Sequence, residues 1–402
     1  MPASPIRKLM PLAEEAKRRG VKVYHLNIGQ PDIETPEVMR RRLTLAPKVL
    51  AYTPSNGTPE FLAALQSYYA SLGLSLTTAD LVATTGGSEA IQFALLACSD
   101  PGGDMLVPEP FYTNYSSFAT MTGLRVVPLT TRGEDGFHLP SREAWERALT
   151  PRTRLVVLCN PNNPTGTVYT PQEVEQVAGF CRDRGLFLVV DEVYRELVYD
   201  GRKPWSALFL SGFEEHVVVV DSLSKRYSAC GIRLGALVTR NRDVHGACLR
   251  MAQGRLSVPG LAQLIAVGLE ELGPDYARGV VQEYEGRRDL LFERLSAIPG
   301  LFVRKPEGAF YFVARLPVED GEDFARFLLS EFQSDGATVM VAPAEGFYAT
   351  PGLGRNEVRI AYVLNQEDLR VAVRVLEAGL AEYRRVRHLP LPGAALASPA
   401  RG

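Results

Sequence analysis

Short apolar runs alternate with longer amphipathic stretches through the central part of the chain. The runs are rich in valine and leucine and are bounded by turn residues, as buried strands are. They lie at 105–107, 155–158, 187–190, 217–220 and 234–238. Helical patterns separate them, for example 171–184, which opens on Pro171 and is rich in Glu and Gln. This alternation predicts an α/β fold with a mostly parallel sheet flanked by helices, in which ligands bind at the carboxyl ends of the strands.

The pattern changes in the C-terminal part of the chain. A long charged helix is expected at 275–297, followed by two strands within 301–316, a helix at 320–334, a strand at 358–363 and a helix at 366–385. These elements predict a smaller α+β domain. The expected boundaries are a large domain over 46–285, a small domain built from 1–45 and 286–387, and a disordered tail at 388–402.

Composition narrows the class of protein. Of 402 residues, 46% are hydrophobic and 22% are charged, which is typical of a soluble globular protein. A net charge of −2 gives no electrostatic footprint for nucleic acid or an anionic membrane. The N-terminal stretch lacks the apolar core of a secretory signal, and no run is long enough to cross a membrane. Five widely spaced cysteines and five scattered histidines predict reduced thiols, no metal site and a cytoplasmic location.

Two strand ends carry residues that suit an anionic or oxygen-rich ligand. Gly86-Gly87-Ser88 follows the apolar run at 81–85 and opens a helix, where backbone amides and the helix N-terminus favour an anion. A tight turn with a serine cap is the alternative interpretation. The run at 155–158 is followed by NPNNPTG (160–166), whose asparagines can donate to a ligand oxygen but are also ordinary turn formers.

Two further strand ends carry charge. Asp191 follows 187–190, where an aspartate is costly to bury unless it meets a cation; a helix N-cap is the alternative. Tyr194 follows in the same turn and could equally be core packing. The stretch DSLSKRYSACGIRLG (221–235) follows 217–220 and contains Lys225, one of only two lysines between Pro54 and Arg304. A lone lysine is usually a surface residue, but here it lies among serines and an arginine.

Together the four strand ends offer an anion cradle, an amide donor, a buried carboxylate with a phenol, and an amine. Pyridoxal 5′-phosphate, with its phosphate, ring hydroxyl, ring nitrogen and aldehyde, satisfies all four. At this point the chain resembles the fold-type I, class I/II PLP-dependent aminotransferases, the aspartate aminotransferase superfamily. The motifs NPNNPTG, DEVY and SLSK occur in family order between LNIGQPD (26–32) and the distal RIA (359–361), so the resemblance covers nearly the whole chain.

The resemblance implies roles for the residues around the cofactor ring. Lys225 would form the Schiff base with PLP and move a proton between the substrate and the cofactor. Asp191 would hold the pyridine nitrogen protonated, and Tyr194 and Asn163 would bind the ring oxygen. Tyr112 would stack on the ring, with Phe111 as the rival for that position.

The resemblance also implies residues for the phosphate and the substrate. Those expected around the phosphate are Gly87, Ser88, Ser222, Ser224 and Arg233. Tyr52 would reach the phosphate of a neighbouring subunit, which implies a homodimer with shared active sites. Arg359 would clamp the substrate α-carboxylate, with Gly29 and Asn163 beside it. The implied reaction moves an amino group between an L-amino acid, aspartate or aromatic, and a 2-oxo acid such as 2-oxoglutarate.

Other protein classes compete with this interpretation. SLSK also fits the S-x-x-K pattern of penicillin-interacting serine enzymes, but no Lys-Thr-Gly occurs and no export signal is expected. A transcription regulator with an aminotransferase-like domain would need a DNA-binding module, for which we expect no room before Leu26. Other reactions on the same scaffold, namely C–S lyase chemistry, ACC-synthase-like elimination or decarboxylation, stay open. Arg255 is the candidate cation for a distal substrate carboxylate, with a structural role as its alternative.

Overall fold

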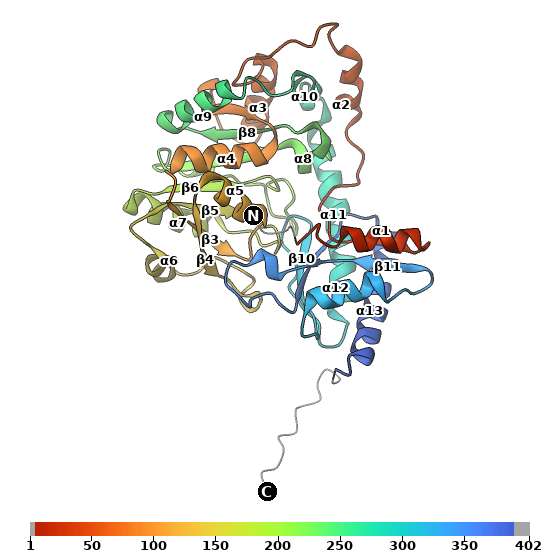
Figure 1. Ribbon diagram of the computed structural model, residues 1–402. Helices are drawn as coiled ribbons and strands as arrows, with labels where there is room; N and C mark the ends of the chain where they lie inside the picture. The colour runs from red at the N-terminus through yellow and green to blue at the C-terminus, as the bar shows by residue number, and fades with distance from the viewer. Residues whose placement is uncertain (1–4, 390–402) are drawn as a thin grey trace. The chain divides into compact units, whose positions relative to one another are not determined.

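The structure is a computed structural model that describes residues 5–389 (Figure 1). The chain divides into two compact units, the first holding Gln30–Glu285 and Pro306–Phe310. The second holds 5–29, Gly286–Lys305 and 311–389. The first unit thus includes 30–45, whereas the sequence pattern predicts these residues in the smaller domain. Of the expected disordered tail, 390–402 lies outside the described residues.

The first unit is built on a seven-stranded sheet of order β2-β8-β7-β6-β5-β3-β4. Its strands are β2 (Leu81–Thr84), β3 (Asp104–Glu109), β4 (Arg125–Thr130), β5 (Thr153–Cys159), β6 (Phe187–Asp191), β7 (Val217–Ser222) and β8 (Gly235–Thr239). Strand β8 runs antiparallel to both β2 and β7, and the other four strand pairs of this sheet are parallel. The mostly parallel, mixed α/β sheet predicted from the apolar runs is therefore confirmed.

Helices cover both faces of this sheet (Figure 1). Buried side chains of α3, α6 and α7 form one core with one set of strand residues, while α4, α5 and α9 contact the strands on the other face. The α-helices of the unit are α2 (Glu37–Arg41), α3 (Pro59–Ser71), α4 (Gly86–Cys98), α5 (Asn114–Thr122), α6 (Arg142–Ala148), α7 (Pro171–Arg184), α8 (Leu223–Arg226), α9 (Arg242–Gly254) and α10 (Gly260–Ile265). The short 3-10 helices are η1 (Arg42–Leu45), η2 (Thr78–Asp80), η3 (Gly133–Asp135), η4 (Ala207–Phe209), η5 (Cys230–Ile232) and η6 (Leu269–Leu272).

Helix α7 illustrates how local sequence sets these boundaries. The Thr170 hydroxyl accepts from the Glu173 amide, and the Glu173 carboxylate accepts from the Thr170 amide, which completes a capping box at the N-terminus. Pro171 occupies the first turn, where its missing N–H costs nothing. At the other end Gly185 adopts a left-handed conformation with φ of 63°, which ends the helix. The helix lies where the sequence predicted it.

The second unit is smaller and contains two sheets. Strands β1 (Lys22–His25) and β11 (Ala337–Met340) pair in parallel, and β9 (Phe302–Val303), β10 (Tyr311–Arg315), β13 (Glu357–Ala361) and β12 (Ala342–Pro343) form an antiparallel sheet. Its helices are α1 (Met10–Arg18), α12 (Gly321–Ser330), η7 (Glu345–Phe347) and α13 (Gln366–Val386), while α11 (Gly273–Ser296) contributes residues to both units. Among the described residues, no helix is long and apolar enough to cross a membrane.

Gly235, at the start of β8, lies where backbone segments of the large sheet and of α4 approach one another closely. A Cβ built on Gly235 at the start of β8 would lie 2.5 Å from the Asp221 carbonyl oxygen and 3.0 Å from the Gly87 amide nitrogen. These are backbone atoms, so they cannot swing aside. The absence of a side chain at Gly235 is what allows β8, β7 and the first turn of α4 to meet.

We therefore expect Gly235→Ala to lower the free energy of unfolding by about 1–3 kcal/mol, the usual cost of overpacking. Gly179→Ala is the matched control, because a Cβ at that α7 position meets nothing within 4 Å and its φ is not positive. The control should raise stability by up to about 1 kcal/mol through helix propensity. Urea unfolding midpoints measure both, and equal midpoints for Gly235→Ala and wild type would refute this account.

Candidate active site

The strand register brings the predicted strand ends to one edge of the large sheet. Cys159 at the end of β5 pairs with Asp191, and Asp191 pairs with Val220 of β7. Since β8 is antiparallel, its first residue Gly235 pairs with both Ser222 and Thr84 at the ends of β7 and β2. The turns that carry Gly87, Asn163, Asp191, Lys225 and Arg233 therefore leave or enter the sheet at this edge.

Asp191 is the buried acid of this edge. Its side chain is 3% exposed, and its Oδ2 accepts a hydrogen bond from the Tyr115 hydroxyl at 2.8 Å. The Val193 amide donates to Oδ1 at 3.3 Å. No cation lies within ion-pair distance among the described residues, and burial raises the pKa of Asp191 to about 6, against the opposing effect of the Tyr115 hydrogen bond. The carboxylate is thus poised to accept a positively charged N–H donor.

Lys225 lies on α8, immediately after β7. Its Nζ is 3.7 Å from the Cys230 Sγ and 5.8 Å from the centre of the Phe310 ring. Phe310 also packs edge-on against Tyr194, with ring centres 5.3 Å apart. The amine and the phenol ring expected at the cofactor are therefore gathered around one aromatic side chain.

An anion cradle lies at the N-terminus of α4. A Cβ on Gly86 would lie 2.6 Å from Arg233 Nη2, so the guanidinium rests against the first turn of this helix. A Cβ on Gly87 would lie 3.7 Å from the Ser222 Cβ, which places that serine beside the same turn. The Ser222 hydroxyl donates to Ser224 Oγ at 2.9 Å. Helix dipole, hydroxyls and a guanidinium together match a phosphate dianion.

The NPNNPTG loop divides its asparagines between two tasks. Asn160 bonds the Tyr169 backbone, and Asn162 Nδ2 donates to the Tyr169 hydroxyl at 2.7 Å, so both fix the loop. Asn163 is buried at 3% exposure. Asn160 and Asn162 therefore have the structural role that was the alternative interpretation of this motif.

The aromatic residues after β3 take different positions. Tyr112 packs edge-on against Tyr115 and accepts from Asn114 Nδ2 at 2.8 Å, while Phe111 is 2% exposed and stacks on Tyr115. Tyr112 is only partly buried, so it keeps an accessible surface for stacking, whereas Phe111 belongs to the core.

Two further predicted residues of the first unit are Tyr52 and Arg255. Tyr52 is 82% exposed. Arg255 is half-buried, and its Nη2 donates to the carbonyl oxygens of Ser55 at 3.2 Å and Ala83 at 3.0 Å. Its Nε lies 3.4 Å from Glu89 Oε1. Arg255 thus ties the segment after Tyr52 to the end of β2, in line with its structural alternative.

Arg359 and Gly29 lie in the second unit. Arg359, on β13, is 1% exposed and donates through Nη2 to the Asn27 carbonyl oxygen at 2.6 Å. Its guanidinium lies 4.5 Å from the Tyr311 ring centre and 5.1 Å from that of Phe347. A Cβ on Gly29 would overlap the Tyr311 hydroxyl. Aromatic faces and a backbone carbonyl therefore fix the orientation of the guanidinium.

These donors fit pyridoxal phosphate. The buried carboxyl of Asp191, without a cation among the described residues, matches a ring N–H. The α4 terminus with Arg233 and Ser222 matches the phosphate, and Lys225 supplies the amine. Glycines at 86, 87 and 235 keep the cradle open, since a Cβ at each would meet neighbouring atoms closer than 3.3 Å.

Three residues at the site were missed by the sequence analysis. Tyr115 bonds Asp191, Phe310 lies beside Lys225, and Cys230 lies 3.7 Å from its Nζ. Tyr115 lies three residues after Tyr112, at the start of α5 (Asn114–Thr122), and the sequence around it gave no signal of its bond to Asp191. Phe310 had none, because it comes from a distant segment.

Comparison with known proteins identifies the relatives of this chain. The sequence profile described as aminotransferase class I and II matches residues 21–376. The aspartate/prephenate aminotransferase of Thermus thermophilus is 33% identical over 90% of this chain and 92% of its own length. Aromatic-amino-acid aminotransferase 2 of Thermococcus litoralis is 30% identical over 95% and 97%. The structure of aspartate aminotransferase from Thermus thermophilus with maleate, 31% identical, superposes with a TM-score of 0.84 over 94% of this chain and 97% of that chain.

The pKa of Asp191 predicts a pH dependence of the cofactor-free protein. Because burial raises this pKa from 3.8 to about 6, the folded state binds the proton more tightly than the unfolded state. Its contribution to stability is therefore full below pH about 4 and is lost as pH rises to about 6, a change of about 3 kcal/mol.

Urea unfolding of the apoprotein at pH 4 to 7 measures this effect. Asp191→Asn should remove that part of the pH dependence, because an amide does not titrate in this range. Saturation of the wild type with pyridoxal phosphate, which supplies a cation, should remove it as well. The prediction is contradicted when the wild-type apoprotein and the Asp191→Asn apoprotein show the same pH dependence of stability.

Proposed function

Because this chain belongs to the class I and II aminotransferases, which are enzymes dependent on pyridoxal phosphate, we propose that Lys225 carries the cofactor. We further propose that the amino donor is aspartate or an aromatic L-amino acid and that the acceptor is 2-oxoglutarate. The observation that carries the proposal is the convergence of Asp191, Lys225 and the Arg233 cradle at one edge of the large sheet. Each matches a different group of the same cofactor.

The chain's residues divide the work around that cofactor. Bound pyridoxal phosphate supplies an aldehyde that takes up the amino group and a ring that accepts electrons from the substrate Cα. Asp191 holds a proton at the ring nitrogen, and the Tyr115 hydroxyl fixes the orientation of its carboxylate. Tyr194 and Asn163 donate to the ring oxygen, and Lys225 moves a proton at its Nζ.

The cofactor is anchored through its phosphate. Arg233 supplies a fixed charge, and the amides at the start of α4 supply uncharged donors. Ser222 and Ser224 complete the set, with Ser88 on the first turn of α4. Since Ser222 and Ser224 precede Lys225 closely in sequence, the same short segment that anchors the phosphate positions the amine.

The substrate α-carboxylate is proposed to bind Arg359, and Gly29 and Asn163 are proposed to contribute as the family resemblance implies. Arg359 suits this role because its orientation is already fixed by the Asn27 carbonyl and two aromatic rings, so little side-chain entropy is lost on binding. Aspartate is favoured as donor by the names of relatives, and maleate, bound by the Thermus thermophilus enzyme, is a four-carbon dicarboxylate. Arg255 is not proposed as the distal cation, because its Nη2 is held by the Ser55 and Ala83 carbonyls and its charge is paired with Glu89.

A homodimer is proposed from the surface of the first unit. Large apolar side chains are exposed close together in sequence before α3, and they are Leu43, Leu45, Val49, Leu50 and Tyr52. Their exposed fractions run from 52% to 82%. Such a concentration of apolar surface is typical of an interface. Burying it against a second copy would bring Tyr52 to the partner's phosphate site, as the family resemblance implies.

The role of Lys225 is tested by Lys225→Ala, with Lys203→Ala, an exposed lysine, as the matched control. We expect kcat to fall at least about a thousandfold in Lys225→Ala and to be unchanged in the control, since only Lys225 supplies the amine and proton carrier. Borohydride reduction followed by peptide mass spectrometry should place the cofactor on Lys225. Attachment elsewhere, or transamination by Lys225→Ala, would overturn the assignment.

The substrate is tested by mixing the enzyme with each of the twenty amino acids and following the visible absorbance of the bound cofactor. Aspartate or an aromatic amino acid should discharge the band, and 2-oxoglutarate should restore it. Release of ammonia or thiol without restoration would point instead to elimination chemistry.

The dimer is tested by Leu50→Asp, which places a charge where Leu50 is 66% exposed. Wild type should sediment at twice the chain mass of 44.1 kDa, and the variant's dissociation constant should rise at least about tenfold because the new charge is desolvated on association. Leu96→Asp, at an exposed leucine of α4, is the control and should stay dimeric. A monomeric wild type, or a fully dimeric Leu50→Asp, would contradict the proposed interface.

A further inference from the structure

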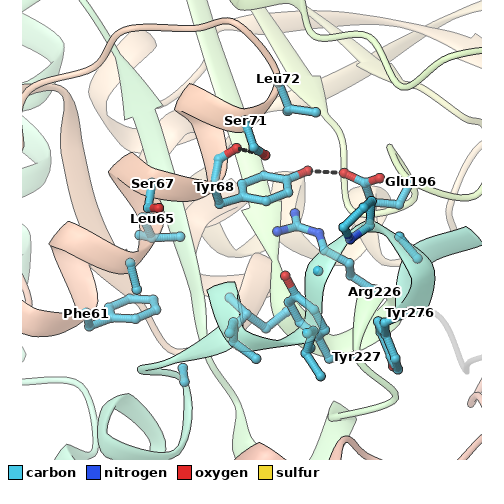
Figure 2. A pocket seen from close by; sticks show the side chains of 18 residues that line it. Phe61, Leu65, Ser67, Tyr68, Ser71, Leu72, Glu196, Arg226, Tyr227 and Tyr276 are labelled. Carbon is cyan, nitrogen blue, oxygen red and sulfur yellow. Dashed lines mark hydrogen bonds between the residues drawn. The ribbon is translucent and has the colours of Figure 1, made fainter.

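A cavity of about 520 Å³ lies within the first unit, between α3, α8, η6 and the start of α11 (Figure 2). It lies on the opposite face of the sheet from Asp191. Asp191 pairs in register with Val220 of β7, and Val220 faces α4, so Asp191 lies on the α4 face of the sheet. Side chains alternate between the two faces along a strand, so the next residue of β7, Asp221, points to the α3 face. None of the residues proposed to hold the cofactor lines the cavity. Its size is that of an ordinary small-molecule site.

Aromatic rings form much of the wall. Tyr227 and Tyr276 stack with ring centres 6.0 Å apart, and Phe61 and Tyr68 contribute from α3. Arg226 lies beside the Tyr68 ring, its guanidinium 3.7 Å from the ring centre (Figure 2). The faces of tyrosine rings attract cations, so this wall already holds one positive group and suits another.

Among the charged groups beside the cavity, carboxylates outnumber guanidiniums by one. Asp221 pairs with Arg226 at 2.6 Å and with Arg195 at 3.2 Å, and Arg195 also pairs with Glu192 at 2.7 Å. Two guanidiniums thus face two carboxylates before Glu196 is counted.

Glu196 is the third carboxylate, and it lines the cavity. It accepts a hydrogen bond from the Tyr68 hydroxyl (Figure 2), but no cation lies within 4 Å of it in the part of the chain that the structure describes. The cluster therefore carries a surplus negative charge at the cavity wall.

The wall also offers an unused polar group. The Tyr276 hydroxyl is buried and has no hydrogen-bond partner among the side chains that the structure describes, which are those of 5–389 except residue 270. A buried hydroxyl without a partner is costly, and a ligand atom can satisfy it. Aromatic faces, a surplus carboxylate and a free hydroxyl converge on one space.

We propose that this cavity binds a small organic cation with an aromatic or apolar body, whose positive charge lies at Glu196 and whose body packs among the tyrosines. An anionic ligand would meet the surplus charge of Glu196, and the one lining cation, Arg226, is already held by Asp221. The site is separate from the transamination chemistry and does not rest on it.

The test uses benzyltrimethylammonium titrated calorimetrically into the cofactor-loaded enzyme. This probe has no N–H, so it cannot react with the cofactor aldehyde. We expect saturable binding of one probe per chain. Glu196→Gln keeps the size of the side chain and an acceptor for Tyr68, and it should weaken binding at least about tenfold because it removes the charge.

A second pair of variants locates the site. Ser67→Trp, at an exposed position of α3 that lines the cavity, should abolish binding by filling the space. Ala63→Trp, an exposed position of the same helix outside the lining, is the control and should bind as wild type does.

Three outcomes would overturn the proposal. They are no binding to the folded, loaded enzyme, equal affinity of wild type and Glu196→Gln, and binding of phenylmethanesulfonate, the anion of similar body, as tightly as the cation. Circular dichroism and transaminase assays on the same samples show that each variant is folded and loaded, so a failure of the proposed reaction is distinguishable from a failure of this site.

Discussion

A buried carboxyl group without a cation is the constraint on which the candidate active site depends. Asp191 ends an apolar strand, and the described residues offer it a phenol and an amide but no positive charge. Burying an unpaired carboxylate is costly, and burial accordingly raises the pKa of Asp191 to about 6. A ligand with a positively charged N–H removes that cost, so the fold itself creates a preference for such a ligand at this position.

The neighbouring strand β7 also carries a buried aspartate, but this one is paired with cations. Asp221 on β7 is also buried, but Arg195 and Arg226 outweigh the effect of its burial and lower its pKa to about 2. The two aspartates lie on opposite faces of the same sheet. On the α3 face two arginines pair with Asp221, whereas Asp191 on the α4 face has no cation beside it among the described residues. The contrast separates a structural carboxylate from one available for binding, although both follow a run of valines and leucines in the sequence.

Sequence was sufficient for whatever depends on local pattern. The Val- and Leu-rich runs predicted the strands, and their parallel order placed Asp191, Asn163 and Lys225 near one edge because parallel strands end together. The sequence could not predict the contact of Phe310 with Lys225 or the ion pair of Arg195 with Asp221. Each of these contacts joins segments that only the tertiary fold brings together. Arg255 was ambiguous for the same reason: whether a guanidinium meets a ligand or the carbonyls of Ser55 and Ala83 depends on the path of a distant loop.

The two adjacent cations of α8 explain why the chain uses a lysine at one position and an arginine at the next. Arg226 pairs with Asp221 at 2.6 Å and lies against Tyr68, which fastens α8 to β7 and α3 on one face of the sheet. A permanently charged, planar guanidinium suits that static contact. Lys225 lies instead beside Cys230 and Phe310, and its amine can lose a proton and act as a nucleophile, which a guanidinium cannot. The arginine fixes the helix, and the fixed helix gives the lysine a defined position from which to react.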